Sequence, residues 1–219
     1  MGKIRNAITK FMTAVRQWKE RRKLKYTDFS IISNNCWAAT AIYQPLGLKY
    51  NTPTVGLFIM DEDYIRMLEN LDYFLNADLQ FILPEDSRYY NKISNGGTKM
   101  VTYPIARLDG DIEIHFLHYH NEEEAREKWQ RRCKRINRKR IIIKMSLRDS
   151  GYDKELMVNR FLDLPFVNKI CFVPKDVAIS NPELIQVPEL TQLNLVGGDE
   201  TDYTLRRINV YKLLNNLIT

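Results

Sequence analysis

Apolar segments that alternate with helical segments predict an α/β fold: a mostly parallel sheet with helices on both faces, in a Rossmann-like arrangement of three layers. The alternation runs from residue 28 to residue 217. The chain has 219 residues, of which 44% are hydrophobic and 27% charged, so it can bury one core and is not disordered as a whole. We expect a single α/β domain over 26–219, preceded by a basic amphipathic helix over 1–25.

Each element follows from a local pattern. Short apolar runs predict the strands, which are 28–33, 55–60, 79–83, 111–117, 140–145 and 169–173. Amphipathic spacing after Asn or Asp caps predicts the helices, which are 36–44, 62–75, 121–137, 152–163 and 203–217. Clusters of Pro, Gly and polar residues make 84–110 and 174–202 irregular, and we expect a hairpin or a mobile loop in the first of them.

The positive charge is concentrated at the N-terminus. Residues 1–25 contain nine bases and one acid, hence +8, whereas the other 194 residues contain 24 bases and 26 acids, hence −2. The sequence pI of 9.1 therefore describes the arm and does not indicate a domain that binds nucleic acid.

The arm also has an apolar stripe at helical spacing, formed by Ile4, Ala7, Ile8, Phe11, Met12, Val15 and Trp18. A basic helix with such a face can lie on an anionic membrane surface. It can equally pack on its own domain or on a second copy, and nucleic acid has less support. Lys10 and Arg16 interrupt the apolar core that a signal peptide would need.

Three cysteines indicate the compartment. Their number is odd and they form no CxxC motif, so we expect a reducing cytoplasm and no disulfide framework. No apolar run approaches the roughly 20 residues that span a bilayer. We expect a cytoplasmic protein that is peripheral to the membrane if the arm binds lipid.

The turn after the first strand is the first candidate site. Residues Ser33, Asn34, Asn35, Cys36 and Trp37 lie between a strand and a helix, where free N–H groups and polar side chains can bind a phosphate or sugar hydroxyls. A helix start would also lower the pKa of Cys36, which makes this residue a candidate nucleophile. The alternative is a plain Asn cap with Cys36 and Trp37 in the core.

All three histidines lie at or after the strand over 111–117. If the strand continues, His118 and His120 share one face and His115 points away. His118 then suits a general base and His120 a ligand contact, although hydrogen-bonded histidines at the sheet rim fit as well. A divalent metal is conceivable, but zinc normally needs three or four ligands, and we assign no metal ligand.

The helix over 121–137 combines local ion pairs with surplus bases. Its acids precede its bases at i, i+4 spacing, which explains much of the charge without a ligand. The bases without local acids are Arg132, Arg135, Arg138, Lys139 and Arg140. They can bind phosphate, an acidic glycan or nucleic acid, or form a solvated face.

Asp61-Glu62-Asp63 has the DxD form that holds a metal and a nucleotide-sugar diphosphate in many glycosyltransferases. Asp61 is equally well placed as a helix cap, with Glu62 and Asp63 as first-turn acids. The chain contains no GxxxxGK[ST], GxGxxG, HExxH or GxSxG motif.

Two longer segments, Phe29–Ile59 and Phe116–Asn137, resemble the signature segments of a bacterial family that has no established activity. Its members are associated with exopolysaccharide biosynthesis and occur among glycosyltransferases in surface-polysaccharide loci. The resemblance covers roughly 28–175 and is carried by SNNCW at Ser33–Trp37, YNTPT at Tyr50–Thr54, LHY at Leu117–Tyr119 and a pattern that ends in RIN at Asn137.

The resemblance implies a surface-glycan context without assigning a catalytic residue. We therefore expect a glycosyltransferase-like or glycan-modifying enzyme that takes a nucleotide sugar, a sugar phosphate or a glycan. The alternatives are an accessory protein that binds a glycosyltransferase or a lipid-linked glycan, and a nucleic-acid-binding protein. The candidate catalytic residues are His118 and Cys36; the candidate ligand-binding residues are Ser33, Asn34, Asn35, Trp37, Tyr50, Thr52, His120, Arg132, Arg135 and Asn137.

Overall fold

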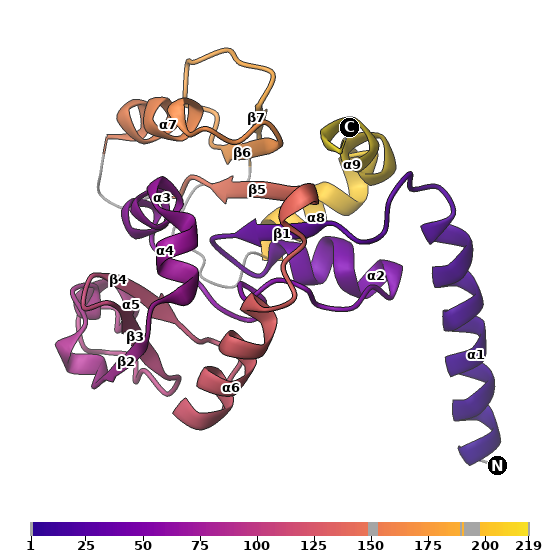
Figure 1. Cartoon of the computed structure of the whole chain (residues 1–219), viewed down its shortest axis with the longest axis horizontal. Helices are drawn as coiled ribbons and strands as arrows, with labels where there is room; N and C mark the ends of the chain where they lie inside the picture. The colour runs from indigo at the N-terminus through magenta and orange to yellow at the C-terminus, as the bar shows by residue number, and fades with distance from the viewer. Residues whose placement is uncertain (1, 149–152, 189, 191–197, 219) are drawn as a thin grey trace.

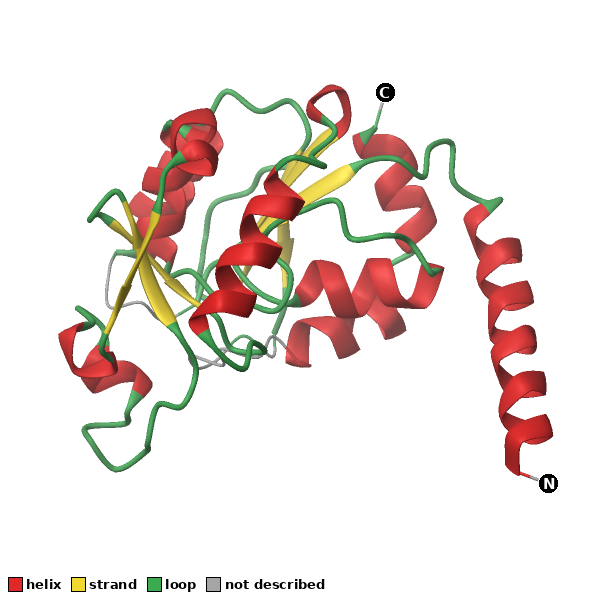
Figure 2. Ribbon diagram, turned by 60° about the horizontal axis from the view of Figure 1, so that its bottom comes forward, coloured by secondary structure: helices red, strands yellow, loops and turns green. Residues whose placement is uncertain are grey.

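The computed structural model describes residues 2–148, 153–188, 190 and 198–218, and shows a mixed α/β body with a long helix beside it (Figure 1). Four parallel strands form one sheet in the order β1 (Ser30–Ser33), β5 (Ile141–Ser146), β6 (Lys169–Val173) and β7 (Leu184–Gln186). Three antiparallel strands form a second sheet: β2 (Leu79–Ile82), β3 (Ile105–Leu108) and β4 (Ile112–His115). Figure 2 shows the two groups of strands apart from each other.

Helices connect and cover these strands. The α-helices are α1 (Gly2–Arg21), α2 (Gln44–Leu46), α3 (Asp61–Glu69), α4 (Leu71–Asn76), α5 (Tyr90–Ile93), α6 (Glu122–Cys133), α7 (Lys154–Asp163), α8 (Gly198–Arg207) and α9 (Val210–Leu217). A π-helix, η1 (Ala38–Tyr43), precedes α2, and the short 3₁₀ turns are η2 (Pro84–Asp86) and η3 (Arg138–Arg140). The α/β class predicted from the alternation of strands and helices is confirmed.

Strands β1 and β6 are buried along their length, as parallel strands usually are, and β5 is buried from its second residue on. Successive side chains of a strand enter two different apolar clusters. Ile32, Ile143 and Met145 pack in a cluster with residues of α3 and α7. Ile31, Ile142 and Phe172 pack in another cluster with residues of η1 and α9.

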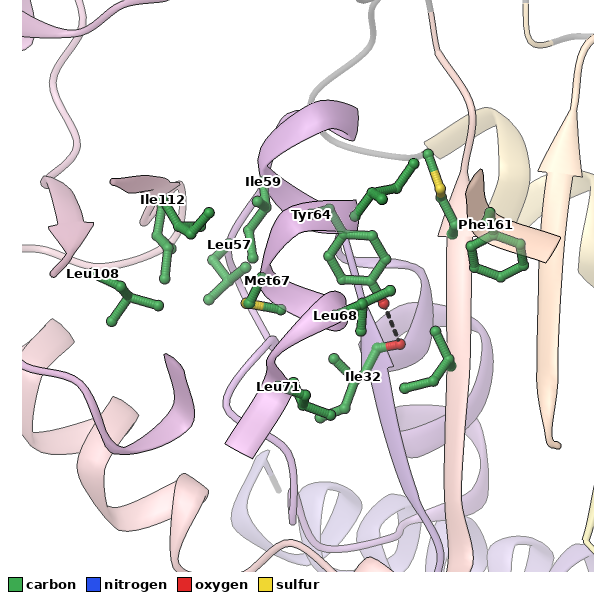
Figure 3. Close-up of a cluster of buried hydrophobic side chains, with 14 of the residues drawn as sticks. Ile32, Leu57, Ile59, Tyr64, Met67, Leu68, Leu71, Leu108, Ile112 and Phe161 are labelled. Carbon is green, nitrogen blue, oxygen red and sulfur yellow. Dashed lines mark hydrogen bonds between the residues drawn. The ribbon is translucent and has the colours of Figure 1, made fainter. Parts of the chain in front are cut away.

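Helix α3 joins the two sheets. In Figure 3, Tyr64 and Leu68 lie beside Ile32 of β1, while Leu108 and Ile112 of the antiparallel sheet lie on the other side of the same cluster. The buried hydroxyl of Tyr64 donates to the carbonyl oxygen of Ile32 at 2.8 Å and lies 3.1 Å from that of Lys144. One helix therefore fixes how the antiparallel sheet sits on strands β1 and β5.

The prediction of one mostly parallel sheet is wrong, because β2, β3 and β4 form a separate antiparallel sheet. Residues 55–60 do not form a strand and make only an isolated bridge between Phe58 and His115. Within 84–110 the expected hairpin is present: this segment contains β3, which pairs with β4 through a tight turn. That turn has positive φ at Asp109 (49°) and Gly110 (71°), as the two central residues of a type I′ turn require, and Asp111 completes a loop of three residues between Leu108 and Ile112.

Other differences concern helix ends and one short strand. Asn70, with φ −140° and ψ 55°, divides the helix expected over 62–75 into α3 and α4. The helix expected over 203–217 is also divided, because Asn209 caps a new helix through its side chain and Lys212 N. Strand β7 was not predicted, because its three residues, half-exposed or exposed, give no apolar run.

The N-terminal arm is helical from Gly2 to Arg21, and Figure 1 shows α1 apart from the sheets. Its C-terminal part reaches α2: Gln17 Nε2 donates to Gln44 O at 3.0 Å, and Arg21 Nη1 donates to Leu46 O at 2.8 Å. Nearer its start, Phe11 and Met12 are 70% and 66% exposed. Most of the apolar stripe thus does not pack on the body.

We predict that Tyr64→Phe lowers the free energy of unfolding by about 1–2 kcal/mol, because it leaves two buried carbonyl oxygens without the hydroxyl. Tyr73→Phe is the matched control: this hydroxyl also has a partner, Asp109, but the side chain is half exposed, so the cost should stay within about 0.5 kcal/mol. Urea denaturation followed by circular dichroism measures both. Equal losses for the two variants would contradict the role given to Tyr64.

Candidate functional site

A cluster of polar side chains lies at the carboxyl ends of the adjacent strands β1 and β5, and each member is at most 2% exposed. We call it the strand-end cluster; its members are Ser33, Asn34, Asn35, Asp61, Lys144, Ser146, Arg148 and Glu200. This edge of a parallel sheet is where α/β proteins bind ligands. In the described strands the order runs in one direction, so the cluster does not lie at a reversal of strand order.

The carboxylate of Glu200 is the centre of the cluster. It comes from α8, and donors from the strand ends surround it. Asn35 Nδ2 lies 3.1 Å from Oε1 and 3.2 Å from Oε2. Arg148 donates to Oε1 from Nε at 3.0 Å and from Nη2 at 2.5 Å. Ser146 Oγ donates to Oε2 at 2.5 Å, and Lys144 Nζ also contacts this oxygen.

Asn34 connects the turn after β1 to the end of β5. Its side chain makes two hydrogen bonds with the backbone of Ser146: Nδ2 donates to Ser146 O at 3.0 Å, and Oδ1 accepts from Ser146 N at 2.9 Å. Nδ2 also lies 3.2 Å from Asp61 Oδ1, and Asp61 Oδ2 accepts from Arg148 N at 3.0 Å. These bonds fix the positions of Ser146 and Arg148 without Glu200.

Burial and charge act on the cluster in opposite directions. Burial lowers the pKa of Lys144 below its ordinary value, although the neighbouring carboxylate of Glu200 opposes this effect. Burial alone would raise the pKa of Glu200, but the charges of Lys144 and Arg148 hold that pKa below its ordinary value. Glu200 is therefore ionised, and Lys144 gives up its proton more easily than a lysine in water.

The cluster has the chemistry of an anion site. An ammonium, a guanidinium, an amide and a hydroxyl converge on one pair of oxygen atoms, as they do on bound carboxylates and phosphates. The Ser146 hydroxyl is oriented as well, because it accepts from Lys144 and donates to Glu200.

The first predicted site segment, Ser33–Trp37, does lie at this place. Asn35 Oδ1 accepts from Trp37 N at 3.1 Å within the turn, while η1 begins after Trp37 without a side-chain cap. The indole of Trp37 is buried and donates to Thr204 Oγ1 of α8 at 2.8 Å. The expected low pKa of Cys36 is wrong in direction, because burial raises this pKa to about 11. Cys36 is therefore not part of the proposed site.

The other predicted residues lie elsewhere. His118 and His120 are exposed on the segment after β4, which belongs to the antiparallel sheet, whereas His115 is buried. These histidines therefore do not lie at the carboxyl edge of the parallel sheet, where Ser33–Trp37 lies. Their roles as base and ligand contact stay predictions.

Arg132 and its neighbours have structural partners. Arg132, 9% exposed, donates to Val55 O at 3.1 Å and to Tyr119 OH at 2.6 Å, and it lies over the ring of Tyr50. Thr52 is buried beside Thr54, whose Oγ1 accepts from Ser33 N at 3.0 Å. Arg132, Tyr50 and Thr52 therefore support the segment before α3. Their direct contact with a ligand stays a prediction.

The remaining predicted residues, Asn137 and Arg135, lie apart from each other, and several bases near them form ion pairs. Asn137 bonds to Asp28 and Ser30 at the amino end of the sheet, which is the opposite edge from the strand-end cluster. Arg135 is exposed. Ion pairs connect Arg131 with Glu127, Arg138 with Asp72 and Arg140 with Asp28. Binding of nucleic acid through these bases stays a prediction.

The DxD motif does not form a metal site in the described structure. Asp61 belongs to the strand-end cluster, Glu62 pairs with Arg160, and Asp63 accepts from Arg88 at 2.8 Å and from Glu113 N at 2.9 Å. The three carboxylates thus have separate partners. Across the described part of the chain, His, Cys, Asp and Glu nowhere gather in a group of three that could hold a metal ion.

Lys144 and Glu200 of the cluster were not predicted from the sequence. Lys144 could have been found, because it interrupts the apolar run IIIKMS of a buried strand, and a buried lysine needs a partner. Glu200 carries no such signal. It follows Gly197-Gly198-Asp199 in a polar stretch, and 56 residues separate it from Lys144.

Two comparisons with known sequences relate this chain to other proteins. The model of a family described as a domain of unknown function, DUF1919, matches residues 7–194. A protein of Haemophilus influenzae named as uncharacterized is 35% identical over 173 residues, which cover 79% of this chain and 75% of that protein. The range matched by the family contains every member of the strand-end cluster except Glu200.

We predict that the cysteine thiols react slowly with a disulfide reagent such as DTNB in the native protein. Burial raises the pKa of Cys36 to about 11 and that of Cys133 to about 12, and it also raises that of Cys171. At pH 8 the thiolate fraction of Cys36 is on the order of 0.1%, so each thiol should react about 100-fold more slowly than in guanidinium. A fast native thiol that Cys36→Ser removes and Cys133→Ser retains would contradict this and restore Cys36 as a nucleophile.

Proposed function

We propose that this chain, which belongs to the DUF1919 family of domains of unknown function, binds a phosphate-bearing sugar at the strand-end cluster and acts on it in the assembly of surface glycans. The ligand class is a nucleotide sugar or a sugar phosphate. The reaction class is glycosyl transfer or glycan modification in exopolysaccharide biosynthesis. The resemblance of Phe29–Ile59 and Phe116–Asn137 to proteins of surface-polysaccharide loci supports this context.

One observation carries the proposal: Lys144, Arg148, Asn35 and Ser146 converge on a single anionic group in a buried place at the carboxyl ends of parallel strands. Phosphate oxygens match such donors, and the Ser and Asn side chains also suit sugar hydroxyls. We treat the parallel sheet as the centre of a Rossmann-like, three-layer unit, because both of its faces pack against helices. In such units this edge holds the substrate.

The arm supports a second proposal, that the protein is cytoplasmic and peripheral to the membrane. Helix α1 leaves Ile8, Phe11, Met12 and Trp18 at least half exposed, amid the nine bases of residues 1–25. Two such arms would repel each other, whereas anionic lipid attracts them, at about 1 kcal/mol per base. None of the described helices is both long enough and apolar enough to cross a bilayer, so this attachment would be at the surface.

We predict that a phosphate-bearing sugar raises the melting temperature of the protein and that Lys144→Met abolishes the effect. A ligand at 100 times its Kd adds about 2.7 kcal/mol of stability, which a thermal-shift assay detects with UDP-glucose, UDP-N-acetylglucosamine and glucose 1-phosphate as probes. Lys134→Met, at an exposed lysine, is the matched control and should respond as the wild type does. Equal responses of the two variants would contradict the assignment of the site. Binding without turnover would favour the accessory role.

We predict that the full chain floats with vesicles that contain phosphatidylglycerol and stays behind with neutral vesicles. Phe11→Glu and Trp18→Glu should each reduce flotation severalfold, because each adds an acid to the exposed apolar face. Val167→Glu provides the control, since Val167 is 89% exposed on the body and should not matter. Flotation that is unchanged by Phe11→Glu, or insensitive to salt, would refute attachment through α1.

A further inference from the structure

We infer that the carboxylate of Glu200 occupies the place where the anionic group of a ligand binds, which we call the anion seat, and that a phosphate-bearing ligand binds by displacing this carboxylate. Glu200 would thus be an internal competitor that keeps the site filled when no ligand is bound. The inference deepens the proposed function, on which it rests for the nature of the ligand as a sugar derivative. The anion seat itself rests on the geometry of the strand-end cluster.

Both oxygens of Glu200 are bound as those of a ligand would be. Oε1 receives Arg148 Nε at 3.0 Å and Asn35 Nδ2 at 3.1 Å. Oε2 receives Ser146 Oγ at 2.5 Å and Lys144 Nζ. The planar Arg148 fork and the tetrahedral Lys144 ammonium approach the same small group, which is how proteins commonly hold phosphate.

The donors belong to the sheet, whereas Glu200 comes from a separate element. Asn35 follows β1, and Lys144 and Ser146 are on β5, with their backbone held by Asn34. Glu200 is in the first turn of α8, which reaches η1 and Trp37 through hydroxyl contacts of Thr201 and Thr204. The seat is therefore built by one part of the fold and filled by another.

The break between α8 and α9 would allow Glu200 to leave the anion seat. Asn209 caps α9, and Leu214 of α9 is buried in the cluster with Ile142 and Phe172. Helix α9 thus holds the sheet independently of Glu200. A rotation of α8 about residues 208–209 would withdraw Glu200 while α9 stays in place.

The family match divides the site in the same way. It spans 7–194 and so includes Asn35, Lys144, Ser146 and Arg148, but it ends before Glu200.

Charge favours exchange of the carboxylate for phosphate. If Glu200 were withdrawn, the ammonium group of the fully buried Lys144 would lose its carboxylate partner. It would then be an uncompensated charge out of water, which is costly in free energy. A phosphate dianion supplies two negative charges and more acceptor oxygens than a carboxylate does. Removal of the Glu200 charge should therefore expose an affinity for free phosphate that the wild type masks.

The test measures binding of inorganic phosphate by the full chain, using calorimetry and thermal shift in chloride buffers of matched ionic strength. Glu200→Gln keeps the shape and removes the competing charge, and Glu155→Gln does the same at an exposed position of α7. We expect Glu200→Gln to bind phosphate at least about tenfold more tightly than the wild type and Glu155→Gln. The double variant Lys144→Met/Glu200→Gln should lose this gain.

Two results would overturn the inference: phosphate affinity of Glu200→Gln equal to that of Glu155→Gln, or a gain that survives in the double variant. If Glu200→Gln fails to fold, Glu200→Asp takes its place, because the shorter side chain withdraws the carboxylate and should raise phosphate affinity less. Tight phosphate binding by Glu200→Gln without a response to any sugar phosphate would refute the proposed function alone. A response of the wild type to sugar phosphates without a gain in Glu200→Gln would refute this inference alone.

Discussion

The buried ion pair between Lys144 and Glu200 is the constraint around which the carboxyl edge of the sheet is built. Both side chains are fully buried, and either charge alone would cost several kcal/mol in that position. The pair makes the apolar strand β5 compatible with a lysine and fastens α8 to it. An apolar pair of similar volume would fill the same space at least as favourably. Stability alone therefore does not account for the cluster, which supports a role in binding.

The two-sheet architecture explains how such a cluster can be both buried and precisely arranged. Asn34 O accepts from Ile59 N at 2.9 Å, which ties the turn after β1 to the segment before α3. Helix α3 then carries Asp61 back to Asn34 and packs Tyr64 on β1. The antiparallel sheet lies on the far side of this helix and thus supports the site from outside without contributing a side chain to it.

Sequence patterns predicted what depends on neighbours along the chain. The turn Ser33–Trp37 is local, and its place at a strand end follows from periodicity. The partition into two sheets was missed, because the strand patterns and the expected hairpin do not indicate which strands pair with which, and β2, β3 and β4 form a sheet of their own. Glu200 was missed for a different reason: its partners are set by tertiary packing across 56 residues, and no local pattern encodes that distance.

The charges of this protein act at two different ranges. Arg5, Lys10, Arg16 and Lys19 of α1 are exposed and act through solvent over about a Debye length of 8–10 Å, so they can attract a surface but cannot choose a ligand. Lys144 is out of water and acts on a group that reaches it in hydrogen-bond geometry. Under this proposal, the N-terminal arm would determine where the protein is placed, and the strand-end cluster would determine which ligand it binds. Because the rest of the chain carries −2, the high pI reflects the N-terminal arm and not the strand-end cluster.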